Sequence, residues 1–398
     1  MTPRIEAALD TTNHVLLALS DERPELDFFG SVVTLADLPG GPSFAGKTVY
    51  LTGDLSKRSE LDLEGARVFV IEELSRNHGG HGELVGLGRV PLRVGGAGVF
   101  YRRFFTDANL FHTICAEHTF QALTESVKPS TAHRTGLYLT PVTRHDDELH
   151  FHLLRCSTNL SGPTENFCAT DRRIVDALNR EAALIFRDHA PLNHVLAQVY
   201  GNTPASDGQK QTKAKISAHA DKTKDMPVDG IMAFCTFYDQ LDKLGTLTSD
   251  GFDRGYKTKS GLTRLRFRLK DGVESTAERP AELSLTLYPD SVFFMPLSTN
   301  RLYTHEIASS MLNAEMLPTR LGYVVRCSKT EAVHKDGATF LKLGGRLVPM
   351  EPPTEQGMLE LRALYAAENR TADFIEYGDR FRFSMNSGDY KLPDAKRG

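Results

Sequence analysis

The feature that most restricts the fold of this chain is a series of short alternations of apolar and polar residues in its middle third. In the segment from Leu262 to Lys270, one face carries Leu265, Phe267 and Leu269, and the other carries Arg264, Arg266, Arg268 and Lys270. Successive side chains of a β-strand point to opposite faces, so such a segment buries one face only. Further runs of strand type are Leu283–Tyr288, Ser291–Met295 and Leu321–Val325. Many short strands separated by Gly, Pro and Asp turns predict a β-sandwich or jelly roll.

Apolar residues recur at helical spacing on either side of this strand-rich part. One such segment lies between Asp171 and Arg187, and another between Met358 and Tyr365. We therefore expect three parts: residues 1–170, a mixed region packed on the core; residues 171–350, the core; and residues 351–398, a helical closing segment. The predicted class is α+β, a jelly-roll core with flanking helices and an N-terminal mixed α/β extension.

The composition is that of a globular protein without strong attraction to polyanions. Of the 398 residues, 40% are hydrophobic and 25% charged, and the formal net charge is −4. This balance gives no global attraction to phosphate backbones or anionic lipid. The first residues lack the pattern of a signal peptide, no apolar stretch approaches membrane-spanning length, and the five cysteines form no CxxC pair. We expect an intracellular protein with no membrane partner.

Three His-x-Asp triplets, which begin at His145, His219 and His334, are candidate metal sites. In a non-haem iron centre of the facial type, two imidazoles and one carboxylate hold the metal on one side. A His-x-Asp triplet on a strand supplies two of these ligands, because residues two apart share a face. His145 lies in a polar turn, and no histidine follows His334. His219 is therefore the candidate, with His305 downstream as the second imidazole.

Two arginines follow His305 on a run of strand type. Arg320 and Arg326 are six positions apart, so a regular strand would point both side chains the same way. A guanidinium can bind a carboxylate through two parallel hydrogen bonds. Structural ion pairs would explain isolated arginines equally well, but their place behind His-x-Asp and a distal His favours a ligand-binding role.

At these residues the sequence resembles the AlkB-like branch of the Fe(II)- and 2-oxoglutarate-dependent dioxygenases. The resemblance covers about residues 190–330. The residues that match the family pattern are Asn193, Leu196 and Tyr200; Ile216, His219 and Asp221; the apolar strand Ser291–Met295; and His305, Arg320 and Arg326.

The resemblance implies a double-stranded β-helix core and a catalytic iron. His219, Asp221 and His305 would bind Fe(II). Arg320 would bind the distal carboxylate of 2-oxoglutarate, with Arg326 near its keto-acid end and Tyr200 also in contact with this co-substrate. Molecular oxygen would be the second co-substrate, and the product a hydroxylated or demethylated substrate.

Three departures from the family pattern bear on the substrate. Gln198 stands where AlkB-type repair enzymes carry Asn, Thr223 stands where nucleic-acid dealkylases carry a carboxylate, and Gly322 occupies a polar position of the family pattern. We therefore expect hydroxylation of a C–H bond in a small molecule, amino acid or nucleoside. AlkB- or TET-like oxidation or demethylation of bases in DNA or RNA stays open, as does a non-catalytic jelly-roll binding protein. The residues of this chain that could follow a phosphate backbone are Arg264, Arg266, Arg268 and Lys270.

Overall fold

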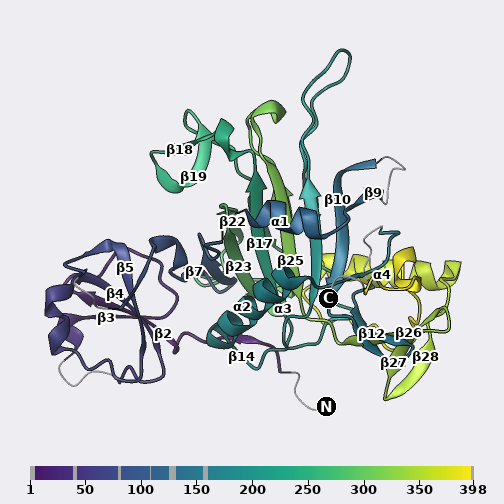
Figure 1. Cartoon of the computed structure of the whole chain (residues 1–398), viewed down its shortest axis with the longest axis horizontal. Helices are drawn as coiled ribbons and strands as arrows, with labels where there is room; N and C mark the ends of the chain where they lie inside the picture. The colour runs from purple at the N-terminus through teal and green to yellow at the C-terminus, as the bar shows by residue number, and fades with distance from the viewer. Residues whose placement is uncertain are drawn as a thin grey trace.

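The computed structural model describes residues 5–38, 43–78, 82–107, 109–124, 131–155 and 160–395. The chain is rich in strands, which form one large sheet, several smaller ones and a few covering helices (Figure 1). None of the helices in the described ranges is long and apolar enough to cross a membrane.

A nine-stranded sheet runs through the centre of the molecule in the order β13-β10-β15-β25-β17-β23-β8-β7, with β9 paired to β10. Its pairs are antiparallel except for β10 with β13. The strands are β7 (Leu92–Val94), β8 (Gly98–Tyr101), β9 (Gln121–Thr124), β10 (Thr131–Thr140), β13 (Glu165–Asn166), β15 (His194–Tyr200), β17 (Ile231–Asp239), β23 (Ser291–Pro296) and β25 (Thr319–Arg326).

A smaller antiparallel sheet of four strands packs against one face of the large sheet. Phe234 and Phe293 of the large sheet meet Leu265, Phe267 and Ile307 of the small one in a shared apolar core. The strands of this small sheet, in spatial order, are β16 (Ile216–His219), β24 (Tyr303–Ala308), β21 (Arg264–Leu269) and β22 (Glu282–Thr286). Two facing sheets of this kind are compatible with the predicted sandwich or jelly roll.

Helices α1 (Leu110–Glu117) and α2 (Ala169–Ile185) cover the opposite face of the large sheet. Successive side chains of β17 point to opposite faces of the large sheet. Ala233 and Cys235 therefore pack toward the helices, whereas Phe234 packs toward the small sheet. The helix expected between Asp171 and Arg187 is confirmed as α2.

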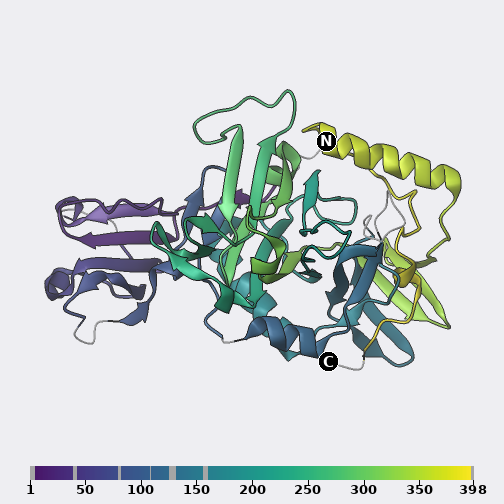
Figure 2. The ribbon, with the colours of Figure 1, turned by 90° about the horizontal axis from the view of Figure 1, so that it is seen from above.

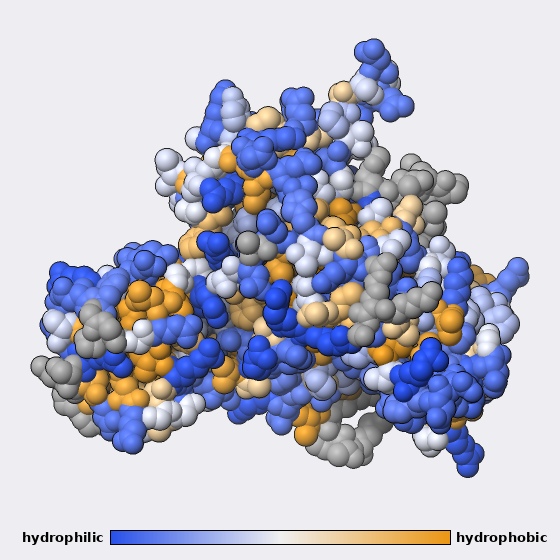
Figure 3. All heavy atoms as spheres, in the orientation of Figure 1, coloured by the Kyte–Doolittle hydropathy of each residue, from blue (hydrophilic) through white to orange (hydrophobic). Residues whose placement is uncertain are grey.

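A parallel sheet near the N-terminus has its own apolar clusters on its two faces. Its order is β3-β2-β4-β5-β6, with bounds Ser31–Thr34, His14–Leu19, Thr48–Asp54, Arg67–Arg76 and Glu83–Val85. Hydrophobic residues gather over this unit on the face shown in Figure 3, and Leu84 of β6 is half exposed. Strands from both sides of residue 170, such as β10 and β15, pair within the large sheet. The boundary between an N-terminal region and the core at this residue stays a prediction.

A fourth sheet joins two strands from the middle of the chain to three strands nearer its C-terminus. The sheet has the order β11-β12-β26-β27-β28, with bounds Thr143–His145, Glu148–Leu153, Thr330–Lys335, Ala338–Leu343 and Arg346–Pro349. Helix α4 (Glu355–Arg370) follows, and Figure 2 shows it lying along one side of the molecule. The remaining named elements include β1 (Ala8–Leu9), β14 (Phe186–Arg187), β18 (Gly245–Leu247), β19 (Asp250–Tyr256), β20 (Lys259–Ser260) and α3 (Leu297–Leu302).

The prediction of an exposed basic face on β21 is wrong for one residue, Lys270. Burial alternates along β21 as expected, with Arg264, Arg266 and Arg268 exposed. Lys270, however, is only 5% exposed, and its Nζ donates to the backbone oxygens of Glu368 at 2.7 Å and Thr371 at 3.2 Å. The strand ends at Leu269, so its alternation no longer governs Lys270, which instead caps the last carbonyls of α4.

Candidate metal centre

The small sheet brings the two predicted imidazoles together. His219 at the end of β16 and His305 on β24 are directly opposite across the antiparallel pair, and their ring centroids are 4.5 Å apart. Asp221 follows His219 by two residues, just beyond the end of the strand. One ligand atom from each of His219, Asp221 and His305 lies within 4.8 Å of the others. The Nε2 atoms of His219 and His305 are 3.5 and 3.8 Å from Asp221 Oδ1.

Burial and charge keep Asp221 ionised and His305 neutral, as metal binding requires. Burial would raise the pKa of the Asp221 carboxyl, but Arg326, whose NH2 lies 2.6 Å from Asp221 Oδ2, holds it well below its usual range. Burial lowers the pKa of His305 to about 3, with a further contribution from His219. An ionised carboxylate beside a neutral imidazole is the donor set that metal binding demands.

A reciprocal pair of hydrogen bonds fixes the backbone of Asp221. Its N–H donates to Oδ1 of Asn300 at 2.8 Å, and Asn300 Nδ2 donates back to the Asp221 carbonyl at 2.9 Å. Asn300 lies on α3 and is buried. Asn300 could not be predicted from the sequence, because a single Asn 79 positions away carries no local signal of the contact.

A cavity of about 250 Å³ opens from the three candidate ligands into the space between the sheets. Strands β15 and β25 contribute residues of even number to its wall, in keeping with the period of two. These residues are Leu196, Gln198, Tyr200, Arg320, Gly322, Val324 and Arg326. Arg320 and Arg326 therefore point to the same side, as their spacing predicted.

Arg320 is a buried cation on this wall. It is 5% exposed, its guanidinium carbon lies 4.0 Å from the centroid of the Tyr200 ring, and within the described ranges it has no acidic partner and its Nε has no hydrogen-bond partner. Tyr200 itself donates to Gln198 Oε1 at 2.8 Å. Gly322 leaves space for this arrangement, because a Cβ there would lie 2.9 Å from Arg320 NH1 and 3.2 Å from Tyr200 Cε2.

The other two His-x-Asp triplets do not assemble a comparable centre. His145 is exposed on β11, and His334 is buried on β26 with Nδ1 3.0 Å from Thr339 Oγ1. Among the described residues, neither belongs to a group of three or more potential metal ligands. Of the three triplets, the one at His219 is the one that the described structure brings together with a second imidazole, and its role as a metal ligand stays a prediction.

A second group of potential ligands, not found in the sequence analysis, lies behind the large sheet. It comprises Glu117, His118, Cys168 and Asp171. Both ring nitrogens of His118 are already engaged, Nδ1 with Glu165 at 2.9 Å and Nε2 with Asp171 at 2.8 Å. Burial would lower the pKa of His118, but the two carboxylates raise it to about 9. We interpret this group as a buried ion cluster between α1 and α2.

The residues around the cavity at His219, Asp221 and His305 form a donor set that is consistent with iron. Two imidazoles and a carboxylate converge from one side, and Arg320, which is buried and has no acidic partner in the described part of the chain, lies on the neighbouring wall. The cavity thus offers three donor groups to a metal ion and one buried guanidinium to an anionic group.

Comparison with known proteins adds little to this geometry. No family model matches the sequence, and no curated protein matches it. One of the solved structures that match, described as "The structure of OsALKBH1", aligns with 48% of this chain and 84% of its own at 13% sequence identity and a TM-score of 0.24.

Proposed function

We propose that this protein is a non-haem Fe(II)- and 2-oxoglutarate-dependent dioxygenase. The observation that carries the proposal is the convergence of His219, Asp221 and His305 on a cavity whose wall also holds the buried Arg320. A two-His-one-carboxylate centre leaves metal positions open for a chelating co-substrate and oxygen.

We also propose that strands β15–β17 and β21–β25 form a double-stranded β-helix. The order of their pairing supports this proposal. The hairpin β21–β22 is innermost, and β17 with β23, β16 with β24 and β15 with β25 pair antiparallel around it. These nested pairs belong alternately to the large and the small sheet. The two imidazoles, His219 and His305, belong to β16 and β24, which form one of these nested pairs.

In this proposal, each residue of the site has a distinct role. His219, Asp221 and His305 would hold the iron, which when bound would supply oxidation of a substrate C–H bond with O2 and 2-oxoglutarate as co-substrates. Arg326 keeps Asp221 ionised. Arg320 would bind the distal carboxylate of 2-oxoglutarate through two hydrogen bonds, with Tyr200 holding the guanidinium by its ring face.

A small molecule, amino acid or nucleoside remains our preferred substrate class. The cavity of about 250 Å³ is modest for a site that must also hold 2-oxoglutarate. The alternative substrate, a base in DNA or RNA, would be favoured if the basic face of β21 bound a phosphate backbone. That face is largely neutralised, because Arg266 lies 3.6 Å from Glu306 and Arg268 lies 3.0 Å from Glu282.

Anaerobic titration of the purified chain with Fe(II) and 2-oxoglutarate tests the proposal. We expect a visible charge-transfer band in the wild type, its loss in His219→Ala, and a requirement for at least about tenfold more 2-oxoglutarate in Arg320→Ala. Arg264→Ala, which removes an exposed arginine outside the cavity, is the matched control and should behave as wild type. A folded wild type without the band would contradict the proposal and favour the non-catalytic binding protein.

A further inference from the structure

We propose that Asn369, near the C-terminal end of α4, is a positioning residue for the metal centre. The inference rests on the metal centre proposed above. It concerns how the chain holds the ligand Asp221, a residue that lies beyond the end of its strand. Asn369 touches none of the three ligand side chains in the contacts described, so its effect would act through the backbone that carries Asp221.

One atom of Asn369 holds both neighbours of Asp221. Its Oδ1 accepts the backbone N–H of Ala220 at 2.8 Å and the Nζ of Lys222 at 2.8 Å. The Lys222 ammonium also donates to the Ala220 carbonyl at 3.1 Å and to the Tyr365 carbonyl of α4 at 3.2 Å. The residue before the metal ligand and the residue after it are therefore tied to the same turn of α4.

This support matters because the sheet does not provide it. The ladder between β16 and β24 ends with the His219–His305 pair, so Asp221 has no strand partner. Asn300 of α3 clamps the Asp221 backbone directly, and Asn369 of α4 clamps the residues flanking it. Without both clamps, rotation of this backbone would move Asp221 Oδ1 away from the two imidazoles.

Glu368, the residue before Asn369, attaches the next residue of the same loop, Thr223, to α4. The carboxylate of Glu368 accepts the N–H of Thr223 at 3.1 Å and also the hydroxyl of Thr223. Its other oxygen accepts the hydroxyl of Tyr377 at 2.6 Å. Glu368 is buried, so these donors stabilise a carboxylate that would be costly to leave unpaired.

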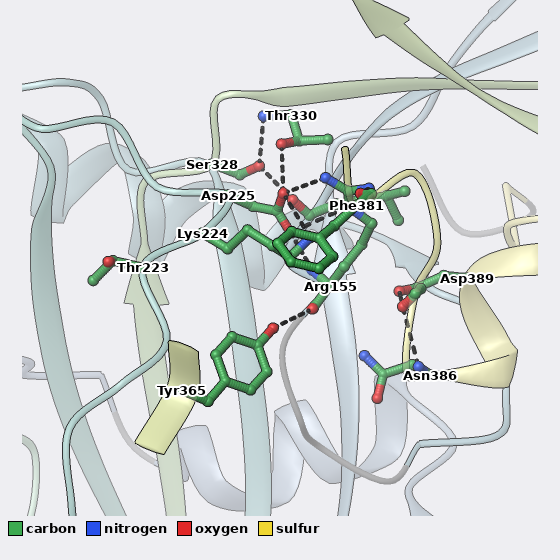
Figure 4. A network of polar contacts seen from close by, with 12 residues as sticks. Arg155, Thr223, Lys224, Asp225, Ser328, Thr330, Tyr365, Phe381, Asn386 and Asp389 are labelled. Carbon is green, nitrogen blue, oxygen red and sulfur yellow. Dashed lines mark hydrogen bonds and ion pairs between the residues drawn. The ribbon is translucent and has the colours of Figure 1, made fainter. Parts of the chain in front are cut away.

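A second network anchors the far end of the same loop (Figure 4). Asp225 accepts the backbone N–H and one guanidinium N–H of Arg155, each at 2.7 Å, and the hydroxyl of Thr330 at 2.9 Å. Tyr365 of α4 donates to the Arg155 carbonyl at 3.1 Å, and Arg155 donates to the Phe381 carbonyl at 2.8 Å. The loop that carries Asp221 is thus attached to the C-terminal segment at several points.

The chemistry of the contacts allows a sharp choice of variants. Both contacts of Asn369 with the loop use its side-chain oxygen as the acceptor. Aspartate offers the same acceptor and adds an attraction to Lys222, whereas leucine has a similar shape and accepts nothing. Asn369→Asp should therefore preserve the positioning, and Asn369→Leu should abolish it.

The test is a titration of the full-length chain with Co(II), followed by its visible d–d absorption. Residues that orient metal ligands typically change metal affinity by about 10–100-fold when they are removed. We expect the Kd for Co(II) to rise at least about tenfold in Asn369→Leu and to stay within about threefold of wild type in Asn369→Asp. Gln356→Ala, which removes an exposed pair with Glu360 on the same helix, should leave the Kd unchanged.

Melting of the metal-free variants separates positioning from folding. A folded Asn369→Leu that binds Co(II) as tightly as wild type would overturn the inference, and so would an Asn369→Asp as weak as the leucine variant. If the leucine variant does not fold, Asn369→Ala takes its place in the same comparison. Failure of the wild type to bind Co(II) would instead overturn the metal centre, and this inference with it.

Discussion

At the scale of single residues, Gly322 shows how a missing side chain can shape a binding site. A Cβ at this position would lie 2.9 Å from Arg320 NH1, a separation that forces the guanidinium to move. We predict that Gly322→Ala weakens 2-oxoglutarate binding about tenfold, because Arg320 leaves its place over Tyr200, while the Kd for Co(II) stays unchanged.

The measurement is the titration of the metal-loaded variant with 2-oxoglutarate. Gly251→Ala is the matched control, since a Cβ at Gly251 would meet nothing within 4 Å. Equal 2-oxoglutarate affinity in the two variants would show that the position of Arg320 does not determine co-substrate binding.

His118 allows a prediction about pH at the same scale. The carboxylates of Glu165 and Asp171 raise the pKa of its imidazole to about 9, against an ordinary value of about 6.5. A pKa raised by folding contributes stability that is complete below the unfolded pKa and is lost as the pH rises through the folded one. The wild type should therefore lose about 2–3 kcal/mol of unfolding free energy between about pH 6.5 and pH 9.

Denaturant unfolding across this pH range tests the prediction. His118→Phe should be less stable at pH 6.5 and should lack most of this pH dependence. The control is His145→Phe at an exposed position, which should keep the wild-type profile. An unchanged profile in His118→Phe would assign the pH dependence to other groups.

At the scale of secondary-structure elements, local periodicity predicted those features that depend on neighbours in sequence. Burial alternates along β21, and the even spacing of Arg320 and Arg326 placed both on the cavity side of β25. Lys270 was wrongly assigned to the exposed face, because its partners on α4 are about a hundred residues away. Sequence periodicity carries no information about such a contact.

The residues of the candidate site also fall into two groups, those that could be predicted from the sequence and those that could not. His219, Asp221 and His305 could be selected from spacing and context, because a facial metal centre demands particular residue types in a particular order. Asn300 and Asn369 could not, since single amide side chains on helices are common and only the folded chain brings them to Asp221.

The packing of helix α2 against the large sheet can be tested at a single buried side chain. Leu178 of α2 is fully buried against the large sheet, on the side away from the cavity. Leu178→Ala should lower the unfolding free energy by about 3 kcal/mol, because it removes buried methyl groups and leaves a cavity. The Kd for Co(II) of the folded variant should not change.

Denaturant unfolding and Co(II) titration measure the two quantities. Leu359→Ala on α4 is the matched control, since Leu359 is 61% exposed and its truncation should alter stability by less than about 0.5 kcal/mol. A large loss of metal affinity in folded Leu178→Ala would mean that the helix layer and the metal centre are coupled through the sheet.

At the scale of the whole molecule, the candidate ligands come from segments that only the folded chain unites. β16 and β24 are far apart in sequence, and the loop that carries Asp221 is held by α3 and α4. An unfolded chain cannot offer the three ligands together, so a metal should bind the native state almost exclusively. Binding of this kind raises the unfolding free energy by an amount set by the ligand concentration relative to its Kd.

We therefore predict that Co(II) at one hundred times its Kd raises the unfolding free energy of the wild type by about 2.7 kcal/mol. Adding 2-oxoglutarate should raise it further with Co(II) present and much less without it, because the metal supplies the chelating position. Chemical unfolding under these four conditions measures both effects. His219→Ala should lose the response to Co(II), and Arg320→Ala should keep it but lose most of the response to 2-oxoglutarate. Equal stabilisation by 2-oxoglutarate with and without metal would place its binding site away from the proposed centre.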